Sequence, residues 1–114
     1  LIFESSNEMK LDNPDNITWS PRGSLLLCED GDVSPQRLRG LTSDGAIFPF
    51  CANNVDFSAG GSGSYRRASG RVFDQDFRGS ELAGASFYNE WLFFNIQTPG
   101  ITFAVTGPWA NGAL

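Results

Sequence analysis

Residues 17–29 read ITWSPRGSLLLCE, a short run of strand-forming residues, a tight turn and a continuous apolar run. Pro21 and Gly23 are the usual residues of such a turn. An apolar run of this length beside turn residues is typical of a buried strand. Residues 85–88 (ASFY) and 92–95 (LFFN) repeat the pattern, a strand followed by a more apolar one. The two stretches therefore predict two β-hairpins of the same kind.

Further strands extend both hairpins. After residues 17–20 and 24–29, the apolar pattern predicts strands over 37–42 and 46–51, joined by an Asp-Gly turn at 43–45. Around the second hairpin it predicts strands over 82–88, 91–97 and 101–106. The remaining expectations are a strand over Leu1–Glu4, a long loop over 52–79, which is rich in Gly, Ser and Arg, and an irregular tail over 107–114.

Composition supports an all-β chain. The 114 residues include 13 Gly, 6 Pro and 10 Phe, which leaves little room for long helices. Strand quartets that repeat at about 40 to 50 residues are typical of β-propeller blades, and an all-β sandwich is the alternative. About two four-stranded antiparallel blades fit this chain, an incomplete ring, since a propeller needs four to eight.

The propeller interpretation divides the chain into four parts. Residues 1–13 end a preceding blade and its loop, 14–51 form one blade, 52–79 form the loop, and 80–114 form the last blade and tail. The remaining blades then come from the same or another chain. Because the sequence starts at Leu1 rather than Met, we expect a fragment.

Charge and residue content exclude several functions. The net charge of −5 argues against nucleic-acid binding, and no apolar run is long enough to span a membrane. The absence of His excludes a Ser-His-Asp triad and His metal ligands. Cys28 and Cys51 are either one disulfide or two buried thiols, and thiols are favoured because small disulfide-built folds use more Cys. Arg66, Arg67 and Arg71 are either solvated side chains of a loop or an anion contact.

The register of the first hairpin points to a carboxylate site. Without a bulge, positions that sum to 44 lie opposite each other, so Asp15 faces Glu29 and Asn16 faces Cys28. Two carboxylates that close repel unless a cation or a proton lies between them. In the second hairpin, which pairs Leu82 with Gln97, Glu81 precedes its strand as Asp15 does in the first.

These residues form a candidate metal site. Asp15, Glu29 and Glu81 are the candidate ligands. Asn16 and Asp30 are either additional ligands or residues that contact the ligands without binding the ion. An oxygen-only, carboxylate-rich set suits a hard cation such as Ca²⁺. The alternative for each residue is ordinary: a strand-start cap or a solvated turn.

The residue sequences of three pairs of stretches resemble the C-terminal part of the PhoX-type alkaline phosphatases. They are Leu11–Ile17 with Leu26–Gly31, Arg37–Thr42 with Gly45–Phe50, and Ser80–Ala85 with Phe94–Ala104. The resemblance implies a β-propeller exported to the periplasm or outside the cell. It also implies phosphomonoester hydrolysis with calcium and iron (Ca²⁺ and Fe³⁺) bound by carboxylates at the ring axis.

Three functions follow from this. The first is a fragment of a metal-dependent phosphatase, inactive in isolation because most of the ring is missing. The second is a non-catalytic, calcium-stabilised binding module. The third is a lactonase-like propeller hydrolase, whose metal sites are also rich in carboxylate and Asn.

Overall fold

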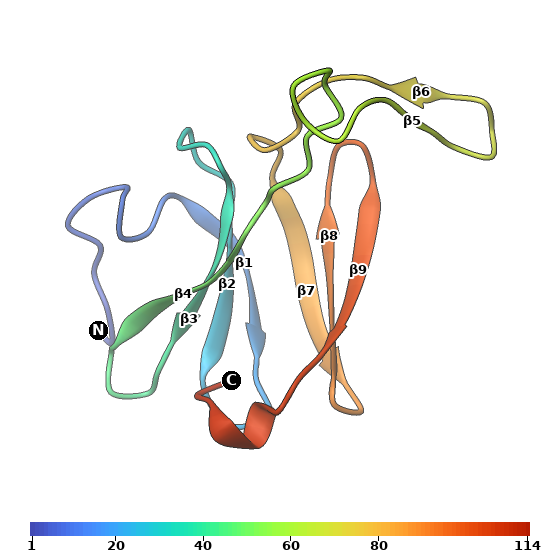
Figure 1. Cartoon of the computed structure of the whole chain (residues 1–114). Helices are drawn as coiled ribbons and strands as arrows, with labels where there is room; N and C mark the ends of the chain where they lie inside the picture. The colour runs from blue at the N-terminus through green and yellow to red at the C-terminus, as the bar shows by residue number, and fades with distance from the viewer.

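The computed structural model describes residues 1–114, and its regular secondary structure is almost entirely antiparallel strand (Figure 1). The first sheet has the order β1-β2-β3-β4. Its strands are β1 (Pro14–Trp19), β2 (Leu25–Glu29), β3 (Arg37–Leu41) and β4 (Ile47–Ala52). All four agree with the strands expected from sequence to within a few residues.

The second sheet has the order β7-β8-β9. It consists of β7 (Leu82–Tyr88), β8 (Trp91–Ile96) and β9 (Ile101–Thr106), again close to the expected strands. The β7–β8 turn places Asn89 and Glu90 at φ of 45° and 63°, as a tight two-residue hairpin requires. A single 3₁₀ turn over Trp109–Asn111 follows, and no helix has the length and apolar character to cross a bilayer.

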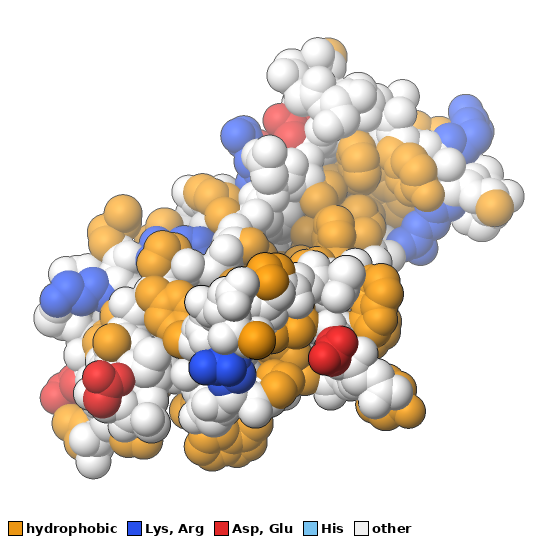
Figure 2. Space-filling view, turned by 60° about the horizontal axis from the view of Figure 1, so that its bottom comes forward, with side chains coloured by type: hydrophobic (Ala, Val, Ile, Leu, Met, Phe, Trp, Pro, Cys, Tyr) orange, Lys and Arg blue, Asp and Glu red, His pale blue; other side chains and the backbone are white.

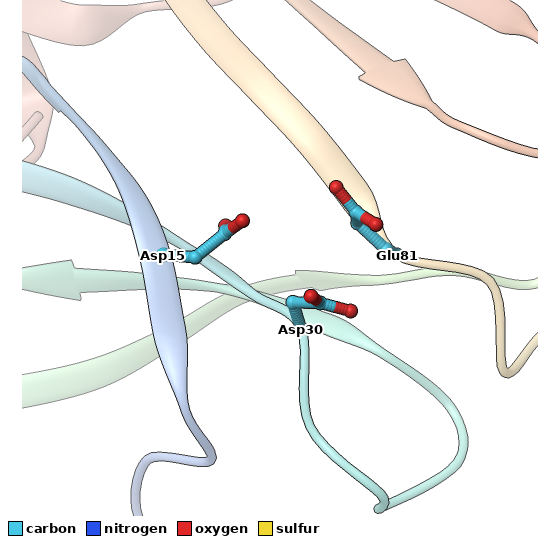
Figure 3. A group of neighbouring side chains, drawn as sticks. All are labelled: Asp15, Asp30 and Glu81. Atoms are coloured by element: carbon cyan, nitrogen blue, oxygen red, sulfur yellow. The ribbon is translucent and has the colours of Figure 1, made fainter.

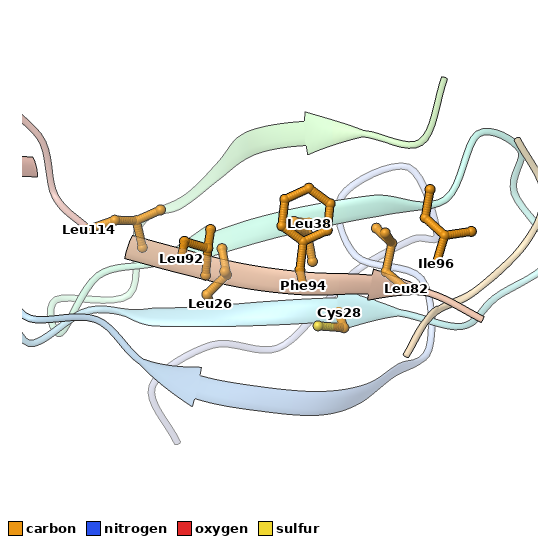
Figure 4. Packing of buried hydrophobic residues seen from close by; sticks show 8 residues of the cluster. All are labelled: Leu26, Cys28, Leu38, Leu82, Leu92, Phe94, Ile96 and Leu114. Atoms are coloured by element: carbon orange, nitrogen blue, oxygen red, sulfur yellow. The ribbon is translucent and has the colours of Figure 1, made fainter. Parts of the chain in front are cut away.

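The core lies between the two sheets (Figure 4). Strand β8 alternates strictly, with Leu92, Phe94 and Ile96 buried and the residues between them exposed. The buried side chains of β8 pack against buried side chains of the first sheet and against Leu114. The full cluster is Leu26, Cys28, Leu38, Leu82, Leu92, Phe94, Ile96 and Leu114. Each fully buried Leu contributes about 1.5–3 kcal/mol to folding. This apolar face is what fixes the position of one sheet on the other.

The first strands of the two sheets, β1 and β7, are neighbours and start at the same end of the molecule (Figure 1). Two adjacent propeller blades have this arrangement, and so do the layers of an open sandwich. The structure confirms the all-β, antiparallel prediction, and the assignment of the sheets as propeller blades stays a prediction.

Two expectations about segments outside the sheets are wrong. Leu1–Glu4 is not a strand, because no neighbouring backbone pairs with it. The 52–79 segment is not only a loop: it contains the hairpin β5 (Tyr65–Arg66) and β6 (Val72–Phe73). A local apolar cluster explains this hairpin, since its Phe73 is buried and packs edge-on against Phe77.

Both cysteines are free thiols, as favoured from sequence. Cys28 and Cys51 each pair with Leu38, from opposite sides of β3. They are therefore two strand spacings apart, about 9.6 Å, which is too far for a disulfide.

Candidate metal centre

A β-bulge at the start of β1 sets the position of Asp15. The predicted pair of Asn16 with Cys28 is confirmed, but Glu29 lies opposite Pro14, because the register shifts between Pro14 and Asn16. The expected Asp15–Glu29 pair is thus wrong. Proline has no N–H for the ladder and is commonly found at such bulges.

A second bulge lies at the start of β7. Leu82 pairs with Ile96 instead of the expected Gln97, and the shift falls between Leu82 and Ala85. Gly84 in this bulge has φ of 110°, a conformation that favours glycine. Glu81 lies just before this strand, and its carbonyl accepts a hydrogen bond from the Gln97 N–H at 3.0 Å. Both hairpins are therefore irregular at the same end of the molecule.

Three carboxylates meet at this end (Figure 3). Asp15 comes from β1, Asp30 follows β2, and Glu81 precedes β7. One carboxylate oxygen of each lies within 4.8 Å of the others. Oxygens that bind one Ca²⁺ at 2.3–2.6 Å are at most about 4.6–5.2 Å apart, so the spacing suits this ion.

No group of the chain neutralises this cluster. The carboxylates of Asp15, Asp30 and Glu81 form no ion pair and accept no hydrogen bond, and those of Asp15 and Asp30 are exposed to solvent. The pKa of Glu81 is raised, first by partial burial and then by the charges of Asp30 and Asp15. Like charges held together in this way are what a bound cation would relieve. The three residues therefore fit a hard cation, with oxygen donors only.

Glu29 lies apart from this cluster. Its side chain is fully buried and binds two guanidinium groups, at 2.5 Å from Arg37 Nε and 3.4 Å from Arg39 Nε. The N–H of Asp12 adds a hydrogen bond at 3.0 Å. A carboxylate already neutralised by two arginines has little charge left for a cation.

The same arginines hold the N-terminal segment. Arg37 donates to the carbonyls of Glu8 and Met9 at 2.7 and 3.1 Å, and Arg39 donates to Met9 at 2.7 Å. These contacts bury most of the Arg39 side chain. The contact between Glu29 and the two arginines could have been predicted from the alternation of side chains along a strand. This alternation places Glu29, Arg37 and Arg39 on one face of the sheet.

Asn16 lies beside a polar depression rather than in the carboxylate cluster. The depression has a volume of about 280 Å³ and is open to solvent. Asn16 shares it with Ser86 and Asn95 of the second sheet, neither of which is a candidate ligand from sequence. Phe93 also lines this depression, which lies between the two sheets at β1 and β7.

Neither cysteine is poised as a nucleophile. Burial raises the pKa of Cys28 to about 11, and burial does the same for Cys51. Both thiols are therefore protonated at neutral pH, and a thiol is a weak nucleophile in that form.

The chain is therefore an all-β protein with an oxygen-only cluster of three carboxylates. The family model for alkaline phosphatase PhoX matches residues 1–100 of the 114. The chain belongs to this family, as the sequence resemblance predicted. No curated protein and no solved structure matches the chain.

Proposed function

We propose that this chain is part of a metal-dependent phosphomonoesterase of the PhoX type, in which Asp15, Asp30 and Glu81 hold a cation. The observation that carries the proposal is the convergence of three carboxylates with no partner in the chain. Family membership supplies the reaction class, phosphomonoester hydrolysis.

Calcium is the cation that the spacing favours, and iron rests on the family resemblance alone. A cation in such a site polarises the phosphoryl oxygens and stabilises the charge of the transition state. Asp15, Asp30 and Glu81 would hold it through carboxylate oxygens. The depression lined by Asn16, Ser86 and Asn95 adds neutral hydrogen-bonding groups nearby.

The proposal includes a larger assembly. The two sheets are adjacent blades of a propeller, and the remaining blades come from the same or another chain. The isolated 114 residues are then inactive, because the three carboxylates supply only part of a metal and substrate site. A periplasmic or extracellular location follows from the same resemblance.

Cation binding by the chain tests the site itself. We expect Ca²⁺ to bind in calorimetry and to raise the melting temperature of the chain. Glu81→Gln should weaken binding by about tenfold or more, since it removes one charged ligand. Asp74→Asn is the matched control, because Asp74 is exposed and has no side-chain partner. Equal Ca²⁺ affinity in the Glu81→Gln protein would contradict the assignment.

Turnover tests the reaction. The protein that carries the remaining blades should hydrolyse p-nitrophenyl phosphate, and thorough chelation should abolish the activity. Activity that survives complete metal removal would sink the phosphatase proposal. Cation binding without turnover would favour the binding module instead, and turnover of a lactone would favour the lactonase-like hydrolase.

A further inference from the structure

The β5–β6 hairpin is the one strongly basic part of an acidic protein. Residues 64–73 include three arginines and no carboxylate, in a chain of net charge −5. The hairpin projects from the two sheets, at the end of the molecule where β7 begins (Figure 1). In the space-filling view, basic side chains lie beside exposed hydrophobic ones at this projecting end (Figure 2).

None of the three arginines has a carboxylate partner. The ion pairs of the chain involve only Arg37, Arg39 and Arg78. Arg66 and Arg71 are exposed, and the one hydrogen bond of the Arg66 side chain goes to the Gly70 carbonyl within the hairpin. Most of their donors are therefore free to bind a ligand.

Two of the guanidinium groups share one aromatic ring. The Cζ atoms of Arg67 and Arg71 lie 5.3 and 4.8 Å from the centroid of Phe73, whose side chain is buried. A cation is attracted to the face of an aromatic ring, so Phe73 restrains the positions of both guanidinium groups. Neither contact places a negative charge beside the two arginines.

The arginine pair is also held in place. Arg67 donates to the Pro99 carbonyl at 2.6 Å and to the Gly100 carbonyl, both in the turn between β8 and β9. This anchor ties the hairpin to the second sheet. A fixed guanidinium loses less conformational entropy when it binds a ligand than a free one does.

We propose that the β5–β6 hairpin is a binding site for phosphate groups, formed by Arg66, Arg67 and Arg71. Guanidinium groups bind phosphate through paired, charge-assisted hydrogen bonds. The site is separate from the carboxylate cluster and needs no cation, so it stands or falls independently of the phosphatase proposal. The phosphate belongs either to a soluble molecule or to a lipid headgroup.

Calorimetry with pyrophosphate at low ionic strength tests the site. The titration contains a chelator, so that no metal ion can bridge the ligand to Asp15, Asp30 or Glu81. We expect binding that weakens as salt is added, because the contacts are ionic. The double variant Arg66→Gln/Arg71→Gln should lose at least about tenfold in affinity, since each charge-assisted hydrogen bond contributes about 1.5–3 kcal/mol. It leaves the Arg67 anchor intact, and an unchanged melting temperature shows that the hairpin remains folded.

Arg22→Gln is the matched control. Arg22 is exposed in the β1–β2 turn and its side chain has no partner, so this variant should bind pyrophosphate as the parent does. A second arm uses vesicles with and without phosphatidylglycerol. Binding only to the anionic vesicles assigns the phosphate to a lipid headgroup, whereas binding to pyrophosphate assigns it to a soluble ligand.

Three results would overturn the proposal. One is no binding to pyrophosphate or to anionic vesicles, and another is equal binding by the double variant. The third is that the chain binds no phosphate but forms a dimer. This dimer dissociates as salt is added and does not form in the double variant. That result would assign the hairpin to the acidic surface of a second copy.

Discussion

The ion cluster around Glu29 offers the sharpest test of the structure. Glu29→Gln keeps the shape of the side chain but removes its charge. Arg37 and Arg39, whose side chains are 13% and 11% exposed, would then lack a carboxylate partner. Their remaining partners are the backbone carbonyls of Glu8 and Met9.

The expected loss of stability is large. Removing one partner of a buried ion pair costs about 3–5 kcal/mol, because the remaining charge is buried without compensation. The arginines here keep some contact with water and with carbonyls, so the lower end, about 3 kcal/mol, is expected. A domain of this size has about 5–15 kcal/mol in total. The loss is therefore a substantial fraction of the stability.

Urea unfolding followed by tryptophan fluorescence measures this change. With an m value of about 1–3 kcal/mol per molar urea, the midpoint should fall by roughly 1–3 M. Glu90→Gln is the control, since Glu90 is an exposed turn residue, and it should change the free energy of unfolding by less than about 0.5 kcal/mol. Both variants are measured in chelator. A Glu29→Gln protein that is destabilised only when Ca²⁺ is present would refute the reasoning, because it would make Glu29 a metal ligand.

Two further predictions concern the core and the thiols. A Cβ at Gly40 would clash with the Phe48 ring, so Gly40→Ala should lower the free energy of unfolding by about 1–3 kcal/mol. Adding Phe48→Leu should restore part of that loss. A Gly40→Ala protein as stable as the parent in urea would contradict this packing. The pKa of Cys28 and of Cys51 is raised by burial from 9.0 to about 11, so the folded state disfavours the thiolate. The contribution of each thiol to stability is complete below pH 9.0 and is lost as the pH rises toward about 11, which thermal melts across this range would show as a falling melting temperature. Rapid reaction of both thiols with a disulfide reagent at pH 8, without denaturant, would argue against their burial.

Local sequence patterns were sufficient to predict most of the fold. The apolar runs at 24–29 and 91–97 mark the central strands because such runs are stable only when buried on a sheet. The Asn89-Glu90 turn was predictable because it separates two apolar runs by two residues. Its length then fixes the register of the strands next to it. Family membership could also be predicted from the sequence, because the long motifs around Asp15 and Glu81 resemble those of the family.

The positions of the charged groups depended on the tertiary structure. The turn length predicts the pairing of two strands correctly only as far as the first bulge. A bulge at Asp15 shifts the pairing, so that Asp15 does not lie opposite Glu29. The three carboxylates that do meet come from both sheets, so only the packing of one sheet on the other could bring them together. The β5–β6 hairpin shows a different limit, since contacts between aromatic residues of the segment itself, Phe57 with Tyr65 and Phe73 with Phe77, stabilise a stretch whose composition indicates a loop. Strand propensity acts between neighbours along the chain, whereas bulges, sheet packing and ion pairs depend on residues that only folding brings close.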